Sequence, residues 1–349
     1  MHMKRTALLS VVGALVLMGA GCSTGSSSSA PDGGIFTTSN LGGAWTQLTV
    51  LNQGAKVGSI GNVATVSTAF DPQEATTMYV GTTQNGLLMT LDGGQSWQQA
   101  RGLTSGQVAS IAVDPQDKCT VFVARLNQLL KTETCGRDWG QVYYDPRTTQ
   151  QYTSVVIDPS NPKTVYAGNV DGDILRSEDG GASWRVLYRA DARINMITID
   201  RRSPQTLYIA TNGAGVLKST NRGEAWTEIR AQLDGFDGSR RPIGVYIDPS
   251  NSNTIYHVSR NGILRSTDGG STWLALSLPT PSAQTNIRAF ALHPRNPSLL
   301  VYATETSVVF TDDLGQTWTP KKLPTSRAAS FLVFDAAAQS NLYLGTIPR

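Results

Sequence analysis

The 349-residue sequence contains little of the chemistry on which most enzyme active sites depend. It has three histidines and three cysteines, and it contains no HExxH, GxSxG or glycine-rich phosphate loop. His257 and His293 stand in strand and turn patterns without credible triad partners, so we assign both to the scaffold. We therefore expect no catalytic residue, no metal site and no cofactor.

A strong excess of charge is also missing. The chain carries 29 basic and 26 acidic residues, and removal of Lys4 and Arg5 would leave 27 and 26. Proteins that bind nucleic acid normally show a clear basic excess. We therefore expect no nucleic-acid partner.

Long hydrophobic runs are absent except for a short one near the N-terminus. Lys4 and Arg5 precede an apolar run of about 14 residues that ends in "GAGC". This pattern predicts a signal peptide over residues 1–21, too short to span a membrane. "GAGC" resembles a bacterial lipobox with Gly19 in place of the usual Leu, which implies lipidation of Cys22. Residues 22–34 would then be the lipidated cysteine and a flexible Ser/Gly tether.

These features predict export to the bacterial cell envelope. Serine after the lipidated cysteine implies the outer membrane rather than the inner membrane of a Gram-negative lipoprotein. A soluble periplasmic or secreted protein is the alternative. The membrane would be contacted through the lipid only.

Tryptophan is scarce, yet every copy ends the same eight-residue box, such as "STDGGSTW" at residues 266–273. Successive boxes lie 42 to 52 residues apart, a period typical of blades or solenoid turns. A hydroxyl residue, a short acceptor and a fixed glycine precede each Trp, as a tight turn at positive φ requires. The acceptor and Trp positions are Asn40, Asp92, Thr134, Asp179, Asn221, Asp268 and Asp313, and Trp45, Trp97, Trp139, Trp184, Trp226, Trp273 and Trp318.

Strand-like segments surround each box, three before it and one after it. Four strands repeated seven times predict an all-β fold, a single seven-bladed β-propeller of four-stranded antiparallel blades over residues 35–349. The mature chain begins with a third strand and ends after a second strand. Strands at about 34–48 and about 328–347 should therefore pair and close the ring.

The boxes resemble the Asp-box, or BNR, repeat (Ser/Thr-x-Asp-x-Gly-x-Thr-Trp) of sialidases, sortilin, xyloglucan hydrolases and Ycf48-type photosystem II assembly factors. The resemblance covers nearly all of the mature chain, but these families perform different functions on one scaffold. Asn40, Thr134 and Asn221 depart from the motif's Asp, which predicts looser turns there. A lipid-anchored seven-bladed propeller is similar to the Ycf48 type. That similarity implies a non-enzymatic protein that assists assembly or stability of an envelope complex, although nothing in the sequence indicates photosynthesis.

Two cysteines remain after the predicted lipidation site. Cys119 precedes the second strand of its blade, and Cys135 lies inside the box of the same blade. Both turns should lie on one face of the blade, so an exported protein would join them in a disulfide.

Arginines gather near the starts of the predicted first strands, which are innermost in a propeller. Long, irregular loops on a rigid ring are where binding specificity is expected, and these loops lie opposite the boxes. The long loops are expected at residues 49–63, 230–242 and 275–287. A basic rim there could bind carboxylate-rich partners. We expect it to bind a protein of the cell envelope and the propeller to be monomeric. The residues are Arg193, Arg241, Arg288 and Arg327, with Arg101, Arg125, Arg189, Arg240 and Arg260 in neighbouring loops.

A carbohydrate-binding or glycoside-hydrolysing propeller is the alternative, because a glycosidase needs only two carboxylates beside a cleft. The loops opposite the boxes contain Asp145, Asp171, Asp173, Asp191, Asp234, Asp237 and Glu305. Solvated turn residues are the simpler interpretation of these acids. Sialidases have six blades and xyloglucan hydrolases pair two propellers, so neither architecture fits this sequence.

Overall fold

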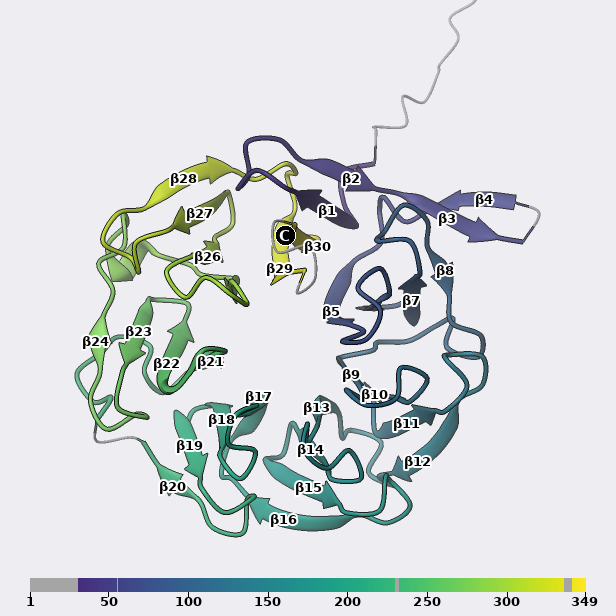
Figure 1. Ribbon diagram of the computed structural model, residues 1–349, viewed down its shortest axis with the longest axis horizontal. Coiled ribbons are helices and arrows are strands. Elements are labelled where there is room, and N and C mark those ends of the chain that lie inside the picture. Colours follow the sequence, from purple (N-terminus) through teal and green to yellow (C-terminus); the bar gives the residue numbers. More distant parts are fainter. Residues whose placement is uncertain (1–30, 55, 230–231, 336–340) are drawn as a thin grey trace, which may run out of the picture. The chain divides into compact units, whose positions relative to one another are not determined.

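The computed structural model describes residues 31–54, 56–229, 232–335 and 341–349. The chain divides into Met1–Ala30 and Pro31–Arg349. The predicted signal peptide and Cys22 lie outside the described residues. Pro31–Arg349 forms a ring of small sheets (Figure 1).

Seven four-stranded antiparallel sheets form the blades, which confirms the predicted seven-bladed propeller. Two blades contain β5 (Thr65–Phe70), β6 (Met78–Thr82), β7 (Leu87–Thr90) and β8 (Gln98–Gln99); and β9 (Ser110–Val113), β10 (Val121–Arg125), β11 (Gln128–Thr132) and β12 (Gly140–Tyr144). Two more contain β13 (Tyr152–Ile157), β14 (Val165–Asn169), β15 (Asp173–Ser177) and β16 (Arg185–Arg189); and β17 (Arg193–Ile199), β18 (Leu207–Asn212), β19 (Val216–Ser219) and β20 (Thr227–Glu228). The next two contain β21 (Pro242–Asp248), β22 (Asn251–Ser259), β23 (Ile263–Ser266) and β24 (Leu274–Ala275); and β25 (Ala289–Leu292), β26 (Leu300–Ala303), β27 (Ser307–Thr311) and β28 (Thr319–Lys322).

The seventh blade joins the two ends of the propeller chain, as the sequence predicts. Its strand order is β2 (Thr46–Leu48), β1 (Ile35–Thr38), β30 (Leu342–Ile347) and β29 (Ala328–Phe334). Phe36 lies opposite Leu344 in this pairing. The contacts of the propeller begin at Asp32, inside the segment expected to be a tether. Its carboxylate accepts hydrogen bonds from the backbone N–H and the hydroxyl of Ser326, just before β29.

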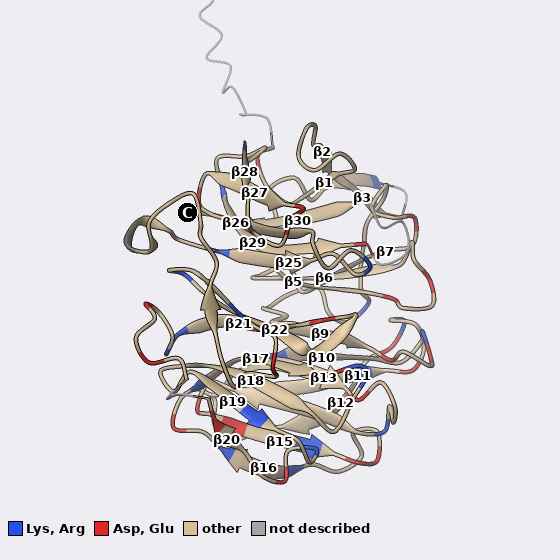
Figure 2. Ribbon diagram, turned by 60° about the vertical axis from the view of Figure 1, so that its left-hand side comes forward, with Lys and Arg blue, Asp and Glu red and all other residues tan. Residues whose placement is uncertain are grey.

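Each blade is buried between its two neighbours. The second and third strands are almost fully buried, as in β6 and β7, whereas the fourth strands are short and largely exposed. A short apolar run buried on both faces is what the sequence of the second strands predicts. The charged residues consequently lie mainly on loops and outer strands (Figure 2).

All seven boxes form the same turn. In each, the hydroxyl oxygen accepts a bond of 2.8 to 3.1 Å from the N–H of the fixed glycine, which lies at positive φ. The short acceptor takes a bond of 2.8 or 2.9 Å from the N–H before Trp. The boxes with Asn40, Thr134 and Asn221 keep both bonds, but they lack the further bond, from a hydroxyl to the second carboxylate oxygen, that all four Asp boxes make.

One hairpin was not predicted. Residues 49–63 were expected to be a long loop, but β3 (Val50–Gln53) and β4 (Lys56–Ser59) pair there. β3 binds the backbone of Trp97 through N–O contacts of 2.7 and 2.8 Å, at the outer edge of the β5–β8 blade. Trp97 is 1% exposed, whereas the other six box tryptophans are half-buried, because the hairpin covers it.

The only helical element within the described residues is a three-residue 3₁₀ helix, η1 (Ser282–Gln284). None of the described segments is therefore a helix able to cross a membrane.

Candidate functional site

The face opposite the boxes carries the starts of the inner strands. Arg193 is the first residue of β17, and Arg241, Arg288 and Arg327 immediately precede β21, β25 and β29. These strands belong to four neighbouring blades around the centre of the ring (Figure 1). The structure thus places the four arginines where the sequence suggested.

A small cavity lies at the centre of this face. Its volume is about 220 Å³, and residues of four blades line it: Val66, Ile243, Arg260, Ile287, Arg288, Ala329, Ser330 and Ile347. The lining residues are mostly apolar, and two arginines, Arg260 and Arg288, are among them. Such a mixture suits an apolar group that bears a negative charge.

The predicted arginines fall into two groups. Arg193, Arg241, Arg260 and Arg288 have no ion pair or side-chain hydrogen bond with any residue that the structure describes. A guanidinium without an internal partner is available for a ligand. These four residues are the rim arginines referred to below.

The other predicted arginines serve the fold or lie elsewhere. Arg327 donates to the backbone and side-chain oxygens of Asn62, and Arg125 donates to the Ser105 carbonyl. Arg189 pairs with Asp173 at 3.0 Å, and Arg240 lies 3.9 Å from Asp234. Arg101 lines a different cavity, between two blades. The expected nine-residue rim is therefore reduced to four residues.

Three of the candidate glycosidase carboxylates surround one arginine, Arg147, which the sequence analysis did not single out. Its guanidinium lies 2.7 Å from Asp145, 3.1 Å from Asp171 and 2.9 Å from Asp173. Arg189 binds the other oxygen of Asp173. The three acids are thus engaged in an ionic network.

This network stabilises the ionised form of the acids. Hydrogen bonds from Arg147 hold the pKa of Asp145 below its usual value. Burial acts to raise the pKa of Asp173, but hydrogen bonds from Arg147 and Asn169 outweigh burial and lower it. A glycosidase acid needs the opposite shift, because it must carry a proton near neutral pH.

The remaining candidate acids lie in separate loops. Asp237 accepts a hydrogen bond from the Ser282 hydroxyl, and Glu305 accepts one from Asn286. Asp191 is exposed in the loop after β16. Their contacts give no support to a catalytic pair.

The predicted disulfide is present and joins Cys119 to Cys135. It connects the turn between β9 and β10 to the box of the same blade. Cys135 also donates its backbone N–H to the Cys119 carbonyl at 3.2 Å. Cys135 has φ of 54°, in the left-handed region that Leu41, Arg222 and Leu314 also adopt at the same box position.

Both histidines act in the scaffold, as expected. His257 is fully buried with Nε2 2.9 Å from the Ser239 carbonyl, and burial lowers its pKa. His293 Nδ1 accepts from the N–H groups of Arg295 and Asn296, as the Asp71 carboxylate does in its own turn. No group of three His, Cys, Asp or Glu suited to a metal occurs in the described parts of the chain.

Comparison with known proteins shows two families of Asp-box propellers. The sequence profile of the photosynthesis system II assembly factor YCF48 matches residues 56–227. That of the sortilin (neurotensin receptor 3) family matches residues 215–342. No curated protein matches the chain in sequence.

Solved structures agree with the fold. YCF48 bound to D1 peptide has a TM-score of 0.63 at 15% identity, covering 82% of this chain and 94% of that one. YCF48 from Cyanidioschyzon merolae has a TM-score of 0.61 at 15% identity, and the match covers 81% of this chain and 95% of that one. The GH74 xyloglucanase from Xanthomonas campestris has a TM-score of 0.66 at 17% identity, and the GH74 enzyme from Niastella koreensis has a TM-score of 0.64 at 16% identity. Each of these two matches covers 81% of this chain but only 51% of the enzyme, so the chain spans about half their length.

Proposed function

From the premise that the chain is a Ycf48-like Asp-box propeller, we propose that it is an interaction scaffold that binds a protein partner through the rim arginines and the central cavity. It performs no chemistry on the partner. Its role is to assist assembly or stability of a complex in the cell envelope. A lipid on Cys22 anchors it there.

The observation that carries this proposal is the set of four rim arginines without internal partners. Arg260 and Arg288 line a mostly apolar cavity of about 220 Å³. An acidic residue next to an apolar side chain on a partner would place its carboxylate on a guanidinium and its apolar group in the cavity. A charge-assisted contact of this kind is worth about 1.5–3 kcal/mol.

Two further observations support the proposal. One of the similar structures is YCF48 bound to D1 peptide, so a propeller of this fold can bind a peptide. The described chain also begins on the arginine face, where Asp32 binds Ser326. Asp32 thus fixes the first described residues to the arginine face.

The glycoside hydrolase alternative has weaker support. Two similar structures are GH74 enzymes, but each is about twice as long as the matched region. Of the candidate acids, Asp145, Asp171 and Asp173 bind Arg147 and form no open pair. We therefore favour binding over hydrolysis.

Affinity capture with two variants tests the proposal. Residues 23–349 are immobilised, and detergent-solubilised envelope of the source organism is passed over them. A rim variant changes Arg193, Arg241, Arg260 and Arg288 to Ala. A control variant removes the same charge from the box face by changing Lys163, Arg201, Arg202 and Arg295 to Ala, all of them exposed.

A single protein retained by the wild type and the control variant should be lost with the rim variant. In a direct titration with that protein, the rim variant should bind at least about tenfold more weakly, the loss expected for one charge-assisted contact. Equal capture by all three proteins would overturn the assignment of the rim. Retention of polysaccharide alone would favour the carbohydrate alternative.

A further inference from the structure

The seams between neighbouring blades are closed by a repeated contact. In several blades, the third-strand residue before the box hydroxyl is a cation that crosses to the next blade. The Lys218 ammonium lies over the Tyr208 ring and donates to the Gly269 carbonyl at 2.7 Å. Arg176 donates to the Arg222 carbonyl at 2.9 Å. These carbonyls belong to the residue before the fixed glycine of the next box.

Two seams without a cation at this position are closed by other side-chain contacts. The Tyr343 hydroxyl donates to the Gly93 carbonyl, which occupies the same box position. The Phe310 ring lies directly against Gly42, the fixed glycine of its neighbouring box. A cation, a tyrosine hydroxyl or an aromatic ring therefore closes each of these seams.

The seam between the β5–β8 and β9–β12 blades has none of these contacts. Met89 stands in place of the cation, and it pairs in register with Tyr79. The Tyr79 hydroxyl has no hydrogen-bond partner among the described residues. No side chain described by the structure donates to the Cys135 carbonyl, the equivalent of Gly269.

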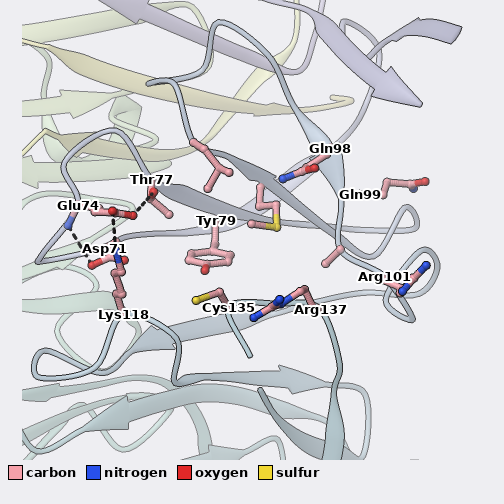
Figure 3. A pocket seen from close by; sticks show the side chains of 14 residues that line it. Asp71, Glu74, Thr77, Tyr79, Gln98, Gln99, Arg101, Lys118, Cys135 and Arg137 are labelled. Carbon is pink, nitrogen blue, oxygen red and sulfur yellow. Dashed lines mark hydrogen bonds and ion pairs between the residues drawn. The ribbon is translucent and has the colours of Figure 1, made fainter. Parts of the chain in front are cut away.

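A cavity of about 470 Å³ opens at this seam, a volume within the usual range for small ligands. Tyr79 lies in the middle of the lining side chains (Figure 3). Met89 and Leu91 also line the cavity and add apolar surface. Leu91 is 56% exposed, a large value for a leucine on a folded surface. The missing contact and the cavity thus occur at the same seam.

The charges at the two ends of this seam pocket differ. At one end, Glu74 is neutralised by Lys118 at 2.6 Å, and the Asp71 carboxylate accepts N–H bonds of its own turn. At the other end lie Arg101 and Arg137, on the opposite side of Tyr79 (Figure 3). Neither arginine has an ion pair with a described residue, and Arg137 donates only to the Thr134 carbonyl.

We propose that the seam pocket is a second binding site, which takes an aromatic or long aliphatic group that carries a carboxylate. The apolar group packs against Tyr79, Met89 and Leu91. The carboxylate binds Arg101 and Arg137. This site lies between two blades, away from the rim arginines, and it does not depend on the function proposed for them.

Calorimetric titration with matched probes tests the proposal. The probes are 4-phenylbutyrate and 4-phenylbutylamine, which share the apolar body and differ in the sign of the charge. We expect saturable binding of the acid and binding of the amine at least about tenfold weaker, the factor expected for a charge-assisted hydrogen bond. An acetylated, amidated phenylalanyl-glutamate dipeptide forms the third probe. Binding of the dipeptide assigns the site to a protein segment, and binding of the free acid alone assigns it to a small molecule.

Two variants connect the binding to the pocket. Met89→Lys should restore the seam cation seen at Lys218 and abolish binding of the acid. Arg101→Gln with Arg137→Gln should weaken it at least about tenfold. A control with Lys163→Gln and Arg201→Gln has the same charge loss on exposed positions and should bind like the wild type.

The outcomes are decisive because each variant can be checked for folding by its thermal transition. Unchanged binding to a folded Met89→Lys protein would overturn the proposal. So would tighter binding of the amine than of the acid, or no saturable binding of the acid at millimolar concentration. Unchanged binding by the double arginine variant would leave the carboxylate unassigned and would also refute the proposed chemistry.

Discussion

The closing blade offers a direct test of how the ring is held together. Phe36 lies on β1, is 5% exposed and packs in one cluster with Phe310, Leu332 and Leu344. Phe36→Ala removes the aromatic ring of this side chain and leaves a cavity in the blade that is formed from both ends of the propeller. Substitutions of buried Phe by Ala cost about 3–5 kcal/mol.

The effect should be visible in heat and in urea. With an unfolding entropy of about 2.1 cal/mol/K per residue, a loss of about 4 kcal/mol lowers the Tm of a propeller of this length by about 6 °C. Phe36→Leu keeps most of the apolar volume and should cost about 1 kcal/mol. Urea unfolding followed by tryptophan fluorescence gives the free energies. A cost below 1 kcal/mol for Phe36→Ala would show that β1 contributes little to closure and would refute the reasoning.

Three further predictions concern the crosslink, the ionic network and catalysis. Replacing Cys119 and Cys135 by Ser should lower the free energy of unfolding by about 3 kcal/mol, since the disulfide closes a loop with a sequence separation of 16; unfolding with and without reductant checks this. Arg147→Gln should destabilise the protein at pH 7 and progressively less in acid, because the lowered pKa values of Asp145 and Asp173 give stability above the unfolded pKa that is lost as pH falls through the folded pKa. Urea midpoints from pH 7 to pH 2 test that trend, and a constant difference would contradict it. Incubation with xyloglucan should release no reducing sugar, and release above that of a heat-denatured control would contradict the proposed absence of catalysis.

The sequence predicts most of the fold because the residue types of each box determine the hydrogen bonds of its turn. A hydroxyl, a short acceptor and a glycine at fixed spacing determine one turn, and the turn fixes the ends of two strands. Thr134 shows how a box without the motif's Asp still forms the turn. A threonine hydroxyl accepts from the Asp138 N–H at 2.9 Å, the same distance as Asp92 reaches in its box.

The candidate site was harder to predict from the sequence than the fold, because its side-chain contacts join loops that are far apart along the chain. Arg125 and Arg327 bind backbone oxygens of Ser105 and Asn62, and a carbonyl leaves no signature in the residue type. Arg147 has Asp145 two positions away, but its other partners, Asp171 and Asp173, belong to a separate turn of the next blade. Position along a strand could be read from the repeat, whereas the choice of partner could not.

The repeat itself supplies internal controls for these assignments. Where the scaffold needs a contact, a different residue type supplies it, as His293 does in place of the turn Asp and Phe310 does in place of a seam cation. Met89 breaks the seam pattern without such a replacement, and Arg101 and Arg137 stand beside the gap without ion-pair partners. Since a closed seam needs only one lysine, as Lys218 shows, Met89→Lys should not reduce stability even if it abolishes binding. Loss of binding with unchanged stability would assign the gap to ligand binding. A loss of stability would instead assign Met89 to the packing of the seam.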